Sequence, residues 1–205
     1  MNERANAILA SFASAIQPRS RILDIGAGKG LLAQAMARQL NARVTMVDVA
    51  SYNQSDLPLT VCDSRALAFA NDSFDYAILS FVLHHTCNPD VILCEALRVA
   101  RAVIVIENDV CGTLRQWLTR AIDSWPALRY GTPPCYVAQP RDAWMKLFAQ
   151  FRVEARIVSE FSLEYRFFRN FTVVLTALRD GERTTDDQIN SSVVGLPSFV
   201  QSVVQ

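Results

Sequence analysis

The stretch from Arg21 to Leu40 constrains the fold of this chain more than any other. It opens with a short apolar run rich in β-branched residues, which is typical of a strand buried on both faces of a parallel sheet. A loop with Gly26, Gly28 and Gly30 follows, where the backbone can approach a ligand because no Cβ intervenes. Leu31 to Leu40 then combines helix-forming residues with one apolar face. A strand, a glycine loop and a helix N-terminus in this order indicate a binding turn for a nucleotide-like ligand.

The spacing of these glycines narrows the class of ligand. A dinucleotide fingerprint, G-x-G-x-x-G, would need its third glycine at position 31, where this chain has Leu31. Instead, Asp24 precedes glycines at alternate positions, and a carboxylate at a strand end suits a cationic amino group better than a pyrophosphate. In this stretch the chain resembles the class I S-adenosylmethionine-dependent methyltransferases of the small-molecule, type 11-like kind, whose first motif is D/E-x-G-x-G-x-G. The resemblance implies that S-adenosyl-L-methionine is bound by Asp24, Gly26, Ala27, Gly28 and Gly30.

Acids that follow the next two predicted strands extend the resemblance. Arg43 to Val47 predicts a buried strand that ends in Asp48, roughly twenty residues past the glycine loop, where an acid can accept both ribose hydroxyls. The resemblance gives this role to Asp48 and places Val49 on the adenine ring. A third short strand precedes Asp63, which the resemblance assigns to the adenine amino group, with the backbone N–H of Ser64 beside it.

The fourth predicted strand, Asp75 to Ser80, runs into a loop that carries both histidines of the chain, His84 and His85. Such a loop lies at the carboxyl end of a central strand, where open α/β sheets bind ligands. The resemblance implies that Ser80 and Phe81 contact the cofactor and that the histidines lie beside its sulfonium. Either histidine could remove a proton from a substrate hydroxyl or amine, because imidazole titrates near physiological pH. The alternative is that both only bond to the backbone and shape the pocket. A metal site is not expected, since adjacent residues of an extended segment point apart.

Predicted strands and helices alternate from residue 21 to about residue 107, which favours a parallel sheet with helices on both faces. Residues 2–17 predict an amphipathic helix, which either covers the mouth of the cofactor site or packs on the sheet. Two final strands, at 152–159 and 171–177, fit an antiparallel hairpin. The expected fold, as the resemblance implies, is an α/β, Rossmann-like, doubly wound seven-stranded sheet, mostly parallel with a C-terminal antiparallel hairpin strand.

An insertion at about 108–140 separates the fifth predicted strand from the helix that follows it. It contains Trp117 and Trp125 among other aromatic residues, and this density suggests a lid over a largely apolar substrate. The same rings could instead form the core of the lid itself. We expect one methyltransferase domain over 1–180 and an exposed tail over 181–205.

Composition restricts the surroundings of the protein. The formal net charge is zero, so bulk charge attracts neither nucleic acid nor a membrane surface. Five cysteines without a C-x-x-C pair favour a reducing compartment and no disulfide framework. We recognise no signal peptide and no stretch near the ~20 apolar residues of a membrane span. We therefore expect a cytoplasmic monomer or homodimer with a small-molecule substrate, and neither nucleic-acid binding nor membrane insertion.

The implied reaction is transfer of the activated methyl group to an O, N or C nucleophile of a small, largely apolar or aromatic metabolite, with S-adenosyl-L-homocysteine as product. The protein would align the nucleophile with the methyl group and exclude water. Two alternatives stay open. One is a module that binds the cofactor without transferring methyl, and the other is a nicotinamide-dependent oxidoreductase, which Leu31 disfavours.

Overall fold

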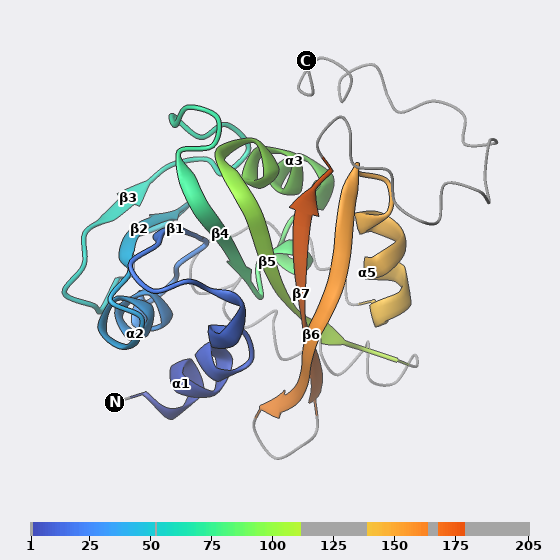
Figure 1. Ribbon diagram of the computed structural model, residues 1–205, viewed down its shortest axis with the longest axis horizontal. Helices are drawn as coiled ribbons and strands as arrows, with labels where there is room; N and C mark the ends of the chain where they lie inside the picture. Colours follow the sequence, from blue (N-terminus) through green and yellow to red (C-terminus); the bar gives the residue numbers. More distant parts are fainter. Residues whose placement is uncertain (1, 52, 112–138, 164–167, 179–205) are drawn as a thin grey trace.

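A computed structural model describes residues 2–51, 53–111, 139–163 and 168–178 of the chain. Its strands are β1 (Arg21–Ile25), β2 (Arg43–Asp48), β3 (Leu59–Val61), β4 (Phe74–Ser80), β5 (Ala100–Asp109), β6 (Val153–Leu163) and β7 (Phe168–Ala177). They form one seven-stranded sheet in the order β3-β2-β1-β4-β5-β7-β6 (Figure 1). The first five strands are parallel to one another, and β7 is antiparallel to both β5 and β6. The predicted doubly wound sheet with a C-terminal antiparallel hairpin is confirmed.

Helices cover both faces of this sheet. The described helices are α1 (Glu3–Ala10), α2 (Leu31–Gln39), α3 (Pro89–Val99) and α5 (Arg141–Phe148), with short 3-10 turns η1 (Ala13–Ala15) and η2 (Leu83–His85). None of these helices has the length and hydropathy needed to cross a bilayer.

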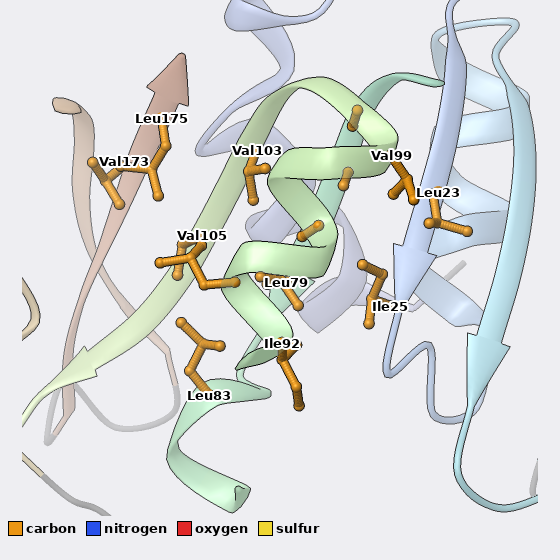
Figure 2. Close-up of a cluster of buried hydrophobic side chains, with 14 of the residues drawn as sticks. Leu23, Ile25, Leu79, Leu83, Ile92, Val99, Val103, Val105, Val173 and Leu175 are labelled. Carbon is orange, nitrogen blue, oxygen red and sulfur yellow. The ribbon is translucent and has the colours of Figure 1, made fainter. Parts of the chain in front are cut away.

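Each face of the sheet has its own buried cluster. On one face, α1 and α2 pack Ile8 and Met36 onto Ile104 of β5. On the other face, α3 and α5 pack Leu93 and Trp144 onto strand residues such as Val105. Figure 2 shows part of this second cluster, with side chains from β1, β4, β5 and β7 gathered under α3. Successive residues of β5 thus belong to opposite cores, which explains why its sequence is a continuous apolar run.

Several element boundaries differ from the sequence-based prediction. The N-terminal helix ends at Ala10 and continues as η1, so it is shorter than the predicted 2–17. Strand β5 begins at Ala100, which pairs with Phe74 in the sheet. The two hairpin strands extend to Leu163 and from Phe168, because their pairing continues to the end of the hairpin. Asn88 is the N-cap residue of α3, and its side chain makes no capping hydrogen bond.

The strand order reverses between β1 and β4, which sets the place for a ligand. The chain leaves β1 for α2 on one face and leaves β4 for α3 on the other. The connections diverge at the carboxyl ends of the two strands, and open α/β sheets bind ligands at such a switch point. Most of the predicted lid (108–140) and all of the predicted tail (181–205) lie outside the described residues.

Candidate active site

The loop between β1 and α2, called the glycine loop here (residues 26–30), takes a left-handed backbone at alternate positions. Gly26, Gly28 and Gly30 have φ of 72°, 56° and 72°. A Cβ at Gly26 would lie 2.5 Å from Cγ2 of Val82, in the segment after β4. Only glycine suits this position, because it tolerates both the positive φ and the close approach. The segment that carries the histidines therefore packs directly against the glycine loop.

Asp24 is a buried acid beside the glycine loop. Its side chain is 1% exposed, and among the described residues its Oδ2 atom has no hydrogen-bond partner. Burial, together with the nearby charge of Asp48, raises the pKa of Asp24 to about 7. An unpartnered buried carboxylate is costly by itself and is compensated when a cationic donor binds. This feature fits the amino group of S-adenosylmethionine.

Asp48, at the end of β2, is tied to the glycine loop. Its Oδ2 accepts a hydrogen bond of 2.8 Å from the Gly28 N–H, and its Oδ1 accepts one of 3.2 Å from Ala50 N–H. The backbone N–H groups of Gly26 and Ala27 also donate to the Val47 carbonyl of this strand. The structure thus brings the predicted ribose acceptor and the glycine loop together. The neighbouring Val49 is 58% exposed, an apolar side chain that a planar ligand could cover.

The predicted adenine acceptor, Asp63, follows β3 at the same edge of the sheet. Its carboxylate forms an ion pair with Arg65, with 2.6 Å between Oδ2 and Nη2. Hydrogen bonds from the Arg65 side chain and backbone lower the pKa of Asp63. The adjacent Ser64 is buried. The ion pair therefore favours the ionised carboxylate of Asp63, in which both oxygens can accept hydrogen bonds.

The segment after β4 begins with an unusual backbone conformation at Phe81. This residue has φ of 58°, and its N–H donates to the Ile106 carbonyl over 2.9 Å. Positive φ is rare for a bulky residue and is concentrated at functional sites. The guanidinium of Arg4 in α1 lies 5.5 Å from the centre of the Phe81 ring. The N-terminal helix packs on the sheet, and its Arg4 reaches the segment beside the glycine loop. That the helix covers the mouth of the cofactor site stays a prediction.

The structure separates the two histidines that the sequence treats alike. His84 is 4% exposed, whereas His85 is exposed. The Nδ1 atom of His84 lies 2.6 Å from Oε2 of Glu107, at the carboxyl end of β5. The other oxygen of Glu107 accepts the Leu83 N–H at 2.9 Å and the His84 N–H at 3.4 Å. Sequence reasoning did not select Glu107; the available signal was an acid closing the strand next to the histidine segment.

Two further expectations concern cysteines and metals. Cys87 is disulfide-bonded, while Cys62 and Cys94 are thiols. The cysteine pattern favours no disulfide framework and does not predict this bond. A count of residue types, without positions in space, does not reveal such a pair. Among the described residues no cluster of three or more His, Cys, Asp or Glu side chains could hold a metal ion.

A cavity of about 900 Å³ opens at the opposite end of the sheet. Its lining includes Ser20, Asp75, Ala100 and Arg101, near the amino ends of β1, β4 and β5. The predicted site lies at the carboxyl ends of the same strands, so this cavity does not belong to it.

Comparison with known proteins finds relatives that match the part of the chain carrying this site. Residues 23–103 match the model of a family described as "Methyltransferase domain". The chain is 28% identical over 144 residues to the demethylmenaquinone methyltransferase of Renibacterium salmoninarum. That match covers 62% of this chain and 61% of the relative, so the chain spans about three fifths of the relative's length.

Solved structures share the fold. The YcgJ protein from Bacillus subtilis superposes with a TM-score of 0.67 at 14% identity, covering 87% of this chain and all of that one. Phosphoethanolamine N-methyltransferase 2 from Haemonchus contortus, solved with phosphomonomethylethanolamine and S-adenosylhomocysteine, gives a TM-score of 0.61 at 16% identity, covering 86% of this chain and 52% of that one. At these identities the likeness concerns the arrangement of strands and helices.

Proposed function

We propose that this chain, which belongs to the class I S-adenosylmethionine-dependent methyltransferase family, transfers a methyl group from that cofactor to a small acceptor molecule. The observation that carries the proposal is Asp24, whose buried Oδ2 atom, beside the glycine loop, has no hydrogen-bond partner among the described residues. A protein without a cationic ligand would gain nothing from this arrangement, because an unpaired buried carboxylate is destabilising.

The residues available to hold the cofactor divide by chemistry. Asp24 suits its amino group, Asp48 its ribose hydroxyls, and Asp63 with Val49 its adenine ring. The glycine loop contributes backbone that can lie against the ligand. Ser80 and Phe81, after β4, complete the proposed set. When bound, S-adenosylmethionine supplies a methyl group made electrophilic by a positively charged sulfur. The protein's own contribution is then to orient the acceptor and exclude water.

For the acceptor, we propose a largely apolar or aromatic metabolite of the quinone-precursor kind. The relative from Renibacterium salmoninarum carries the name demethylmenaquinone methyltransferase, which supports this class. The tryptophans at 117 and 125, in the proposed lid, suit an aromatic acceptor as well. We further propose a cytoplasmic enzyme, monomeric or homodimeric, without nucleic acid as a partner; zero net charge supports the latter point.

Calorimetric titration tests the cofactor assignment. S-adenosylhomocysteine should bind, and NADH should not, because the glycine spacing does not fit a dinucleotide. Asp48→Ala should weaken the affinity at least tenfold, since it removes both the proposed ribose acceptor and the bond to Gly28. The exposed Asp56→Ala serves as the matched control and should bind as the wild type does. Absence of S-adenosylhomocysteine binding to the wild type would overturn the proposed function.

Methyl transfer itself is tested with radiolabelled S-adenosylmethionine and a 1,4-naphthohydroquinone that has an unmethylated ring carbon. Simple phenols and amines serve as O and N acceptors in parallel. Labelled product from the naphthohydroquinone supports the proposed acceptor class, and label only in the phenols or amines contradicts it. Binding of S-adenosylhomocysteine with no labelled product from any acceptor would favour the alternative of a binding module.

A further inference from the structure

We propose that Glu107 is a positioning residue, which holds the buried His84 in the tautomer that accepts the acceptor's proton at Nε2. This inference rests on the proposed methyl transfer and names the proton-handling residues of that same site. It distinguishes His84 from His85 and adds a carboxylate from a strand that sequence reasoning had not connected with them.

The contacts of Glu107 determine which hydrogen lies on which nitrogen. The carboxylate is fully buried, and its Oε1 accepts backbone N–H groups from Leu83 and His84. The other oxygen, Oε2, lies 2.6 Å from Nδ1 of His84. A carboxylate bonded in this way is an acceptor, so Nδ1 carries the hydrogen and donates it. In the neutral imidazole this leaves the basic lone pair on Nε2.

Burial strengthens the electrostatic attraction between His84 and Glu107. When His84 takes up a proton, the imidazolium lies against a carboxylate that is shielded from water, and the attraction between them is stronger than at a surface. A buried imidazole without such a carboxylate would resist protonation because of desolvation. The two backbone contacts of Glu107 fix its carboxylate against the His84 ring.

The pair lies next to the glycine loop. Val82, two residues before His84, is the residue that a Cβ at Gly26 would contact. Within the described part of the chain, Glu107 from β5 and His85 from η2, whose ring centre is 4.2 Å away, are titratable groups that face the His84 ring. Arg4 of α1 lies over the ring of Phe81, whose centre is 6.4 Å from that of the His84 ring.

The proton that the acceptor loses passes first to His84 and then to water. As the acceptor is methylated, its O–H, N–H or C–H bond breaks and leaves the electron pair on the acceptor. The proton forms a bond with the Nε2 lone pair of His84, which becomes an imidazolium paired with Glu107. The proton then passes to water, and the neutral Nδ1–H tautomer is restored.

Nitrogen-15 NMR of histidine-labelled protein tests the tautomer directly, because the chain has only two histidines. We expect one imidazole to be neutral with its hydrogen on Nδ1, and this signal should persist in His85→Gln, which assigns it to His84. Glu107→Gln should remove the signature, and the exposed Glu154→Gln should leave it in place. The inference would be overturned if the hydrogen of His84 lies on Nε2, or if Glu107→Gln leaves the nitrogen-15 spectrum unchanged.

Kinetics with the naphthohydroquinone acceptor test the chemical role. His84→Gln keeps an N–H donor for Glu107 but has no basic nitrogen, so it provides a second variant if Glu107→Gln folds poorly. We expect kcat to fall roughly 100-fold or more in His84→Gln and at least ~10-fold in Glu107→Gln, with part of the rate recovered at alkaline pH. Both variants should bind S-adenosylhomocysteine like the wild type.

Two kinds of failure are distinguishable. A wild type that binds no S-adenosylhomocysteine contradicts the proposed function. A wild type that binds it and methylates the acceptor, with unchanged kcat and pH profile in Glu107→Gln and His84→Gln, contradicts only the role assigned to these two residues.

Discussion

The buried carboxyl group of Asp24 lowers the stability of the ligand-free protein, and we propose that it strengthens binding of the cofactor. In the unfolded chain its carboxyl ionises near its ordinary pKa of 3.8, whereas in the folded protein burial keeps the proton on until about pH 7. Folding is therefore penalised progressively as pH rises from about 4 to 7, and the full penalty persists above that. A difference of this size corresponds to the order of 4 kcal/mol.

The first prediction concerns Asp24→Asn, which removes the charge at nearly constant volume. The ligand-free variant should be more stable than the wild type at pH 8, by up to about 4 kcal/mol, and the advantage should shrink toward pH 4. Urea unfolding at the two pH values measures this. A variant that is less stable than the wild type at pH 8 would contradict the burial argument.

The second prediction concerns the same carboxyl during binding. The amino group of S-adenosylhomocysteine should prefer the ionised form of Asp24, so affinity in the wild type should fall as pH decreases from 8 to 6, approaching tenfold per pH unit below 7. Asp24→Asn should bind weakly, without this dependence. Calorimetry across this pH range measures the affinity for S-adenosylhomocysteine. A wild-type affinity that does not change with pH would count against the amino-group assignment.

At the scale of elements, the two ends of the insertion meet at the carboxyl end of β5. The Oδ1 atom of Asp109 accepts a hydrogen bond of 2.9 Å from the N–H of Arg141, the first residue of α5. Next to it, Val110 donates its N–H to the Gln139 carbonyl over 3.3 Å. The backbone before the insertion is therefore hydrogen-bonded to the backbone after it. This junction lies at the carboxyl ends of the strands, the same end of the sheet as His84 and Glu107.

The third prediction follows from this closure. Replacing residues 113–137 by a short Gly/Ser linker should preserve folding and S-adenosylhomocysteine binding, because Val110 and Gln139 already lie side by side. Methyl transfer to the naphthohydroquinone should be lost if the insertion covers the acceptor. Thermal unfolding, calorimetry and the radiolabel assay separate these effects. Full activity of the shortened protein would refute the proposed lid.

Some contacts between elements could be predicted from the sequence and others could not. The glycine loop and Asp48 follow successive strands, so the order of the elements predicts that they lie close together. The contact between His84 and Glu107 depends instead on the register of β4 against β5, which pairs Ser80 with Ile106. No local pattern specifies that register, although the acid at the end of β5 was visible. The shorter α1 is similar, because tertiary packing of Phe12 ends the helix before the periodic pattern does.

For the whole molecule, the sheet separates two buried cores. Ile8 of α1 belongs to one, and Ile92 of α3 belongs to the other. The alternation of strands and helices in the sequence predicts this three-layer arrangement, because a sheet with apolar strands must be covered on both faces. What the sequence did not convey is how completely the two clusters are divided between the faces.

The fourth prediction uses this division. Ile8→Val and Ile92→Val should each lower the free energy of unfolding by ~0.5–1.5 kcal/mol. Because the sheet lies between the sites, the double variant should lose the sum of the two within about 0.5 kcal/mol. Urea unfolding of the four proteins measures the coupling. A clearly non-additive double variant would show that strain passes through the sheet.

The junction between Asp109 and Arg141 has a consequence for how such enzymes diversify. Because the backbone on either side of the insertion is held together here, we expect that the intervening segment can be exchanged for one of different length without rebuilding the strands that carry the proposed cofactor site. Chimaeras spliced at this seam would then inherit the methyl donor from one parent and the choice of recipient from the other.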